Sequence, residues 1–209
     1  MEDKPIFWLR DYRVIHKIAT LGPSGTSSES AAQYMQTLLG RKLDIHLFDS
    51  FELASRYTED RSDCALLVAN AYRDADYFYM NPKTSLLGSF FFRTPDYFIC
   101  CKDKEELKNK LNLKKRISIV THKAPSSRIK DLIISARNNG FNFDLNNIEI
   151  EYTDATSKGA EEVSRNAFDC CLTNKSAANK YLLDVVSLPL VIEMTWAVFI
   201  KTNNKIKER

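Results

Sequence analysis

Hydroxyl-bearing residues gather at one junction between a strand and a helix, in the stretch "LGPSGTSSESAA". Gly22 and Gly25 bracket a tight turn, and Thr26, Ser27 and Ser28 follow at the start of a predicted helix. The N–H groups of a first helical turn have no intrahelical partner and carry partial positive charge, so hydroxyls beside them favour anion binding. The stretch therefore predicts a site for a carboxylate or phosphate, with a helix capped by one hydroxyl as the alternative.

Two later junctions repeat the arrangement. In "VTHKAPSSRIKDL" a strand ends at His122, and Ser126, Ser127 and Arg128 begin the next helix. In "YTDATSKGAEEV" Thr156 lies at the start of the helix. A cation in a first helical turn opposes the helix dipole, and a bound carboxylate would offset the positive charge of Arg128. The alternative is that Arg128 is a solvated surface residue. His122 is the histidine best placed for catalysis, because it lies where a strand ends; a packed structural histidine is the alternative.

Strands and helices alternate along most of the chain, which predicts an α/β fold with open sheets. The expected elements are strands at 14–22, 43–50, 64–72, 116–122, 148–152 and 168–173, and helices at 27–39, 50–60, 104–112, 126–140, 157–166 and 175–183. The aromatic stretch 74–101 shows no clear helix, and 185–201 forms two extended pieces. The last piece needs a sheet to join, and the first sheet is the expected one.

This order predicts two lobes joined by a double crossover. Lobe 1 takes residues 1–95 plus 189–209, and lobe 2 takes residues 96–188. A cleft between the two lobes is the expected ligand site, because clefts between lobes are preferred places for small molecules.

Composition excludes several classes of function. The net charge of +3 comes without a basic stripe carrying aromatic residues, and the basic tail 201–209 reads as a frayed end, so no nucleic-acid partner is expected. No stretch approaches the roughly 20 apolar residues of a membrane span, and no signal peptide opens the chain. We therefore expect a cytoplasmic protein with five reduced, packed cysteines and no metal site.

The ordered motifs resemble those of prephenate dehydratases. They are "IATLGPSGTSSESAA", "DCALLVANAY", "VTHKAPSSRI", "DATSKGAEEV" and "TNKSAANKYLL", within a resemblance that runs from Ile18 to Lys201. The resemblance implies the two-lobe fold of type 2 periplasmic binding proteins. It also places Asn70 near the family's Asn-Ser segment, although that segment can be aligned in more than one register.

Two departures set the chain apart from dehydratases. Where that family has Thr-Arg-Phe, this chain has Thr195, Trp196 and Ala197. In addition, no ACT regulatory domain is expected. The chain is more similar to the non-aromatising prephenate decarboxylases of bacilysin or anticapsin biosynthesis, which share "TLGPSGTSSE" and the aromatic segment "NAYRDADYFYMNP".

This closer resemblance implies an enzyme without a cofactor that removes CO2 from prephenate and yields a dihydro-4-hydroxyphenylpyruvate. The alternatives are a dehydratase that forms phenylpyruvate and a non-catalytic module that binds a small dicarboxylate. A homodimer is the expected assembly.

The expected site residues fall into two groups. Thr195 is the family's threonine, and the proton that the reaction needs is expected from Tyr72, Tyr97, His122 or Lys123. The substrate-binding shell is expected to contain Thr26, Ser27, Ser28, Asn70, Ser126, Ser127, Arg128 and Thr156.

Overall fold

The computed structural model describes residues 7–9 and 12–202, which form two compact units. The first contains the described residues up to Thr94 and those from Glu193 onward, and the second is Pro95–Ile192. The sequence predicts that lobe 1 resumes at residue 189, whereas in the structure the chain rejoins the first unit at Glu193. Residues 203–209 of the basic tail lie outside the described part.

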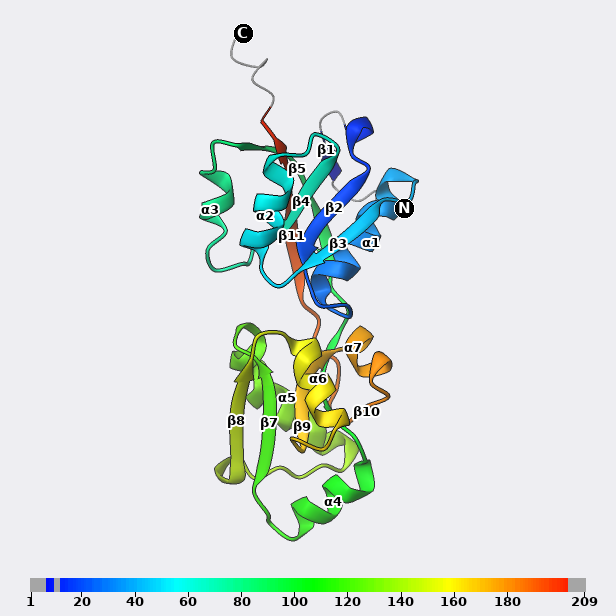
Figure 1. Cartoon of the computed structure of the whole chain (residues 1–209). Helices are drawn as coiled ribbons and strands as arrows, with labels where there is room; N and C mark the ends of the chain where they lie inside the picture. Colours follow the sequence, from blue (N-terminus) through cyan, green and yellow to red (C-terminus); the bar gives the residue numbers. More distant parts are fainter. Residues whose placement is uncertain (1–6, 10–11, 203–209) are drawn as a thin grey trace. The chain divides into compact units, whose positions relative to one another are not determined.

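The first unit is built on a six-stranded sheet in the order β1-β5-β11-β4-β2-β3 (Figure 1). Strands β2, β3 and β4 run parallel, and β11 pairs antiparallel with both β4 and β5, so the last strand does join the first sheet. The strands are β1 (Phe7–Leu9), β2 (Lys17–Leu21), β3 (Asp44–Phe48), β4 (Cys64–Ala69), β5 (Thr84–Arg93) and β11 (Glu193–Lys201).

Helix α1 connects β2 to β3, helix α2 connects β3 to β4, and both pack on this sheet (Figure 1). The helices are α1 (Ser27–Leu39), α2 (Phe51–Glu59) and α3 (Asp76–Tyr79), after a 3-10 turn at Tyr12–Val14. The predicted bounds of α1 and the predicted cap of α2 by Ser50 are confirmed. The aromatic stretch was expected to lack a helix, and this is wrong for α3; four residues are too few to show a helical period.

The second unit has a five-stranded sheet in the order β10-β6-β9-β7-β8. Strands β7, β8 and β9 run parallel, and β6 runs antiparallel to β9. The elements are β6 (Tyr97–Cys101), α4 (Lys104–Asn112), β7 (Ile117–His122), α5 (Ile129–Ala136), β8 (Ile148–Thr153), α6 (Thr156–Ser164), β9 (Cys170–Asn174), α7 (Lys175–Lys180) and β10 (Asp184–Val185), with 3-10 turns at Ala124–Arg128, Arg137–Asn139 and Leu145–Asn147.

Adjacent cysteines on β6 and β9 point to opposite faces of this sheet, as expected of a strand. Cys100 and Cys171 pack in the cluster under α6 and α7, whereas Cys101 and Cys170 pack in the cluster under α5. All five cysteines are buried and unbridged, and burial raises the pKa of Cys100 and of Cys101 to about 12. The expectation of packed thiols is confirmed.

Candidate functional site

The carboxyl edge of the first sheet brings two predicted site residues together. Asn70 directly follows β4, and β11 enters the sheet beside it, with Trp196 opposite Ala69. Asn70 N donates to the Thr195 carbonyl at 3.0 Å, and Asn70 Nδ2 donates to Thr195 Oγ1 at 2.9 Å. Because Thr195 accepts this bond and is exposed, its own hydroxyl proton is available to a ligand.

A residue that the sequence did not single out completes this group. The Tyr79 hydroxyl, from the end of α3, donates to Asn70 Oδ1 at 3.1 Å. The Tyr79 ring stands edge-on to Phe199, with 5.0 Å between the ring centroids. The aromatic segment was noticed as a family feature, but spacing alone could not choose Tyr79 from its three tyrosines.

Tyr72, which the sequence favoured, has a different partner. Its hydroxyl donates to Glu52 Oε1 at 2.9 Å, and its ring packs edge-on against Phe51 at 4.9 Å. Burial, with Glu52 nearby, raises the pKa of Tyr72 to about 12. Its proton is therefore both engaged and hard to release at neutral pH.

The junction at α1 is a capped helix that carries its own anion. Thr26 Oγ1 accepts from Glu29 N at 3.3 Å and donates to the Leu21 carbonyl at 3.2 Å. The Glu29 carboxylate in turn accepts from Gly25 N at 2.6 Å and from the Ser24 hydroxyl. These bonds resemble a capping box, except that Glu29 accepts from the residue before the N-cap, so the carboxylate expected at this turn is supplied by the chain itself. Ser27 is half-buried beside it, and Ser28 is buried.

The two glycines of this turn serve backbone geometry. Gly22 N donates to the Phe48 carbonyl at 2.7 Å, and a Cβ on Gly22 would lie 3.1 Å from Leu47 Cβ. Gly25 has a φ of +94°, which side-chain-bearing residues rarely adopt. The turn therefore needs glycine at both places.

The carboxyl edge of the second sheet collects His122, Thr153 and Asn174, the last residues of β7, β8 and β9. His122 is half-buried, and its Nδ1 accepts from Ala124 N at 3.2 Å, so the neutral ring carries its proton on Nε2. Burial lowers the pKa of His122, and the nearby Asp154 only partly opposes this. His122 is thus neutral at pH 7 in the free protein.

Helix α6 begins at this same edge without a side-chain cap, because its N-cap residue is Ala155. Thr156 is buried at the first helical position, and its carbonyl accepts from the Thr173 hydroxyl at 2.9 Å. Ser157 Oγ and Thr153 Oγ1 are buried without a hydrogen-bond partner in the described part of the chain. An open helix N-terminus with two unpartnered hydroxyls is chemically suited to an anion.

Arg128, the cation expected to oppose a helix dipole, already has a partner, and so does Lys158 in the first turn of α6. Lys158 Nζ lies 3.1 Å from Asp154 Oδ2, and Arg128 Nε donates to Asp131 Oδ2 at 2.8 Å. Both pairs are exposed and contribute little to stability. Arg128 is therefore not held ready for a substrate carboxylate.

The helix expected at 126–140 begins differently. Residues Ala124–Arg128 form a 3-10 turn, and the α-helix α5 follows only at Ile129, because Pro125 opens the turn and no side chain caps it. Ser126 Oγ donates to the Lys123 carbonyl at 2.7 Å. Ser126 and Ser127 border a pocket of about 360 Å³ whose other walls are mainly isoleucines of α5 and β8.

Tyr97 is a core residue. It begins β6 opposite Asn174, but its side chain is only 9% exposed and packs with Ile99 and Ile129 on the α5 side of the sheet. Helix α6 packs on the other side. Tyr97 and the α6 terminus therefore face away from each other.

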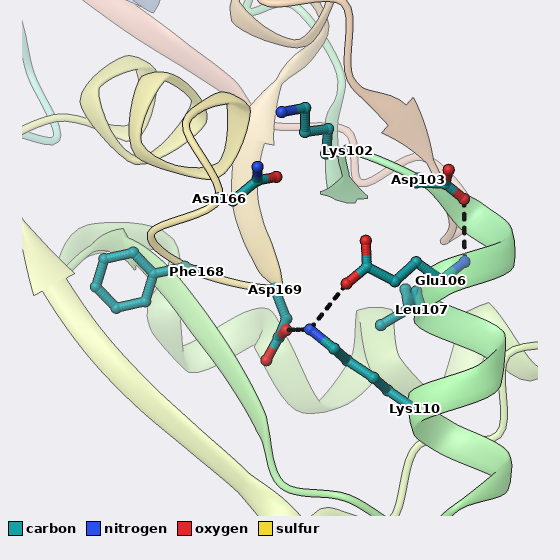
Figure 2. Close-up of a pocket in the computed structure, with 8 residues that line it drawn as sticks. All are labelled: Lys102, Asp103, Glu106, Leu107, Lys110, Asn166, Phe168 and Asp169. Carbon is teal, nitrogen blue, oxygen red and sulfur yellow. Dashed lines mark hydrogen bonds and ion pairs between the residues drawn. The ribbon is translucent and has the colours of Figure 1, made fainter.

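A second pocket, of about 50 Å³, lies at the opposite edge of this sheet, beside α4 (Figure 2). Lys110 Nζ crosses it to Asp169 Oδ1 at 2.7 Å and to Glu106 at 3.2 Å. Burial alone would raise the pKa of Asp169, but bonds from Lys110 and Ser118 lower it overall. This closed network ties α4 to the amino ends of β7 and β9 and has a structural role.

Within the described residues, no three His, Cys, Asp or Glu side chains come together as a metal site requires, and no helix is long and apolar enough to cross a membrane.

Comparison with known proteins gives clear relatives. No protein-family model matches the chain. A prephenate decarboxylase of Planktothrix agardhii is 32% identical over 195 residues, which cover 91% of each chain. A prephenate decarboxylase of Bacillus subtilis strain 168 is 30% identical over 186 residues, covering 87% of this chain and 85% of that protein.

Solved structures agree in fold. A quorum-quenching acylase and the prephenate dehydratase of Arthrobacter aurescens each superpose over 90% of this chain with a TM-score of 0.60, at 15% and 12% identity. This chain spans 64% and 61% of their lengths. A methionine-binding lipoprotein of Bacillus subtilis, at 13% identity, superposes over 94% of this chain and 87% of its own length with a TM-score of 0.51. The predicted α/β fold, of the periplasmic-binding-protein type, is confirmed.

Proposed function

The chain belongs to the prephenate decarboxylase family, and we propose that it removes CO2 from prephenate while the ring hydroxyl stays in place. In this reaction the bond between the quaternary ring carbon and its carboxylate breaks, and the electron pair enters the ring diene. A ring carbon then takes up one proton. The product is a dihydro-4-hydroxyphenylpyruvate, and no oxidant or reductant is needed.

The observation that carries this proposal is the environment of Thr195. The two residues after it, Trp196 and Ala197, are buried, and neither can act as an acid toward a leaving hydroxide. Thr195 itself accepts a hydrogen bond from Asn70 and can donate its own proton to the ring hydroxyl. A neutral alcohol orients that hydroxyl but is too weak an acid to expel it as water. Decarboxylation without aromatisation is the expected result.

We place the pyruvyl carboxylate of prephenate at the start of α6. The uncapped terminus and the unpartnered hydroxyls of Thr153 and Ser157 support this place. The corresponding place at α1 is already filled by the Glu29 carboxylate. A fixed carboxylate at one end of the substrate leaves the other carboxylate free to lose its hydration and depart.

For the proton we propose His122. Tyr72 is engaged with Glu52 and Tyr97 is buried, whereas His122 is half-buried at the same edge as α6. Prephenate carries two negative charges, and these would stabilise the imidazolium form and raise its pKa when the substrate binds.

This assignment gives a pH dependence. We expect kcat/KM to fall as pH rises through the pKa of free His122, which lies below the ordinary value of 6.5. The profile of kcat should break at a higher pH, because the substrate-bound ring titrates later. Steady-state rates across the pH range check this. Profiles of the same shape in His122→Gln would assign the proton to another group.

The experiment for the function itself is incubation of the purified protein with prephenate. We expect CO2 and a non-aromatic product. Phenylpyruvate would instead support the dehydratase alternative, and tight prephenate binding without turnover would support the binding module.

Three further proposals follow from the sequence. The product would enter the biosynthesis of a bacilysin-like antibiotic or a related non-proteinogenic amino acid. The enzyme would act in the cytoplasm, where its five thiols stay reduced, and as a homodimer, which sedimentation would test.

A further inference from the structure

We propose that Tyr79 is a positioning residue: it fixes the side-chain amide of Asn70 and thereby directs the hydroxyl proton of Thr195 toward the substrate. This inference rests on the proposed function, because it assigns the Thr195 proton to the ring hydroxyl of prephenate. It adds a residue that acts through two others and does not itself touch the substrate.

The three side chains form a continuous chain of hydrogen bonds. Tyr79 donates to Asn70 Oδ1 at 3.1 Å, and Asn70 Nδ2 donates to Thr195 Oγ1 at 2.9 Å. The backbone bond from Asn70 N to the Thr195 carbonyl, at 3.0 Å, sets the spacing between the last two. The ring of Tyr79 is anchored against Phe199 at an interplanar angle of 81°. Both ends of this series of hydrogen bonds are therefore held at β11: Thr195 belongs to that strand, and the Tyr79 ring packs on its Phe199.

The donor-to-acceptor direction of these hydrogen bonds decides whether Thr195 can donate its proton to a substrate. An amide presents an acceptor on one side and donors on the other, so the orientation of Asn70 determines whether Thr195 accepts or donates. If Asn70 were turned over, Thr195 would donate its proton to the amide oxygen and keep none for the substrate. A group that prefers to donate to the amide oxygen is needed to prevent this.

The Tyr79 phenol meets that requirement better than the Thr195 hydroxyl does. A phenol is a stronger acid than an aliphatic alcohol, so the phenol is the preferred donor to the amide oxygen. Partial burial raises the pKa of Tyr79, an effect that its bond to Asn70 partly offsets, so the phenol keeps its proton at neutral pH. Thr195 is then left to accept from the amide nitrogen.

The other tyrosines of the segment are occupied elsewhere. Tyr72 donates to Glu52, and Tyr77 packs edge-on against Phe78 with 5.1 Å between ring centroids. Tyr77 is exposed like Tyr79 and lies two residues away on the same short helix. It therefore provides a matched control for the loss of a phenol hydroxyl.

The test is a set of steady-state measurements with prephenate on four variants: Tyr79→Phe, Tyr77→Phe, Asn70→Ala and the double variant of Tyr79 and Asn70. Removing the Tyr79 hydroxyl should lower kcat about fivefold, the value of one modest hydrogen bond, and leave KM within about twofold. Tyr77→Phe should match the wild type. In the Asn70→Ala background, Tyr79→Phe should cause no further loss.

Each other outcome overturns a distinct claim. If Tyr79→Phe equals the wild type, or lowers kcat equally with and without Asn70, Tyr79 does not act through Asn70. Denaturant midpoints of all variants separate these results from loss of folding. A wild-type protein that leaves prephenate unchanged would overturn the proposed function, and the inference with it, whatever the variants do.

Discussion

Replacing Thr195 by valine is expected to lower kcat for prephenate decarboxylation about a hundredfold, the cost of losing the group that orients the reacting ring. Valine has nearly the same shape and suits a strand, so the β11 pairing should be kept. The residue is exposed, and the free energy of unfolding should change by less than about 0.5 kcal/mol. Steady-state kinetics and denaturant unfolding measure both effects.

Thr195→Ser is the matched control, because serine keeps the hydroxyl and loses only a methyl group. It should retain most of the activity of the wild type. Equal activity of the valine and serine variants would remove the Thr195 hydroxyl from the mechanism.

The substitution Ala155→Asp is expected to stabilise the protein and at the same time weaken substrate binding. Ala155 is the N-cap of α6 and has an extended backbone, so an aspartate there can accept from the free N–H groups of the first turn. This should raise the unfolding free energy by about 1 kcal/mol. The new negative charge should raise KM for prephenate at least about tenfold, because it occupies and repels the carboxylate site.

Comparing Ala155→Asn with Ala155→Asp separates the effect of the negative charge from the effect of capping the helix. Asparagine forms a similar cap without a charge, so it should give similar stability and a much smaller rise in KM. If both variants bind prephenate as the wild type does, the substrate carboxylate does not lie at α6. If both lose stability, crowding of the buried Ala155 site would explain the binding loss, and Thr156→Val then tests the same place.

Regular elements could be read from the sequence where local signals agree. Helix α1 runs over Ser27–Leu39 as predicted, because Thr26 caps its start and Gly40, with a φ of +64°, ends it. The alternation of strands and helices likewise predicted both sheets. Such features depend on neighbours along the chain, which the sequence displays directly.

The anion expected at α1 shows how one sequence signal can fit two structures. The spacing of Thr26 and Glu29 is that of a capping box, and it was visible in the sequence. The hydroxyls predict either a ligand site or a helix cap; in the structure Thr26 Oγ1 accepts from Glu29 N, and the Glu29 carboxylate accepts from Gly25 N. That this carboxylate folds back onto the turn depends on the rotamer of Glu29, which spacing along the chain does not determine.

The contacts around Asn70 could not be predicted from spacing. Thr195 lies 125 residues further along the chain, and only the antiparallel pairing of β4 with β11 places it beside Asn70. Tyr79 belongs to a helix too short to show periodicity, and its orientation depends on the Phe199 ring across the sheet. Long-range pairing and ring packing, rather than local propensity, decide such sites.

The most direct test of the central claim is the proton NMR spectrum of the product formed from prephenate in D2O at mildly alkaline pH, with an enzyme-free sample as reference. The account predicts loss of CO2, a ring that keeps its hydroxyl-bearing carbon and stays non-aromatic, and one deuteron on a ring carbon. An aromatic spectrum of phenylpyruvate without ring deuterium, formed faster than in the reference, would contradict it.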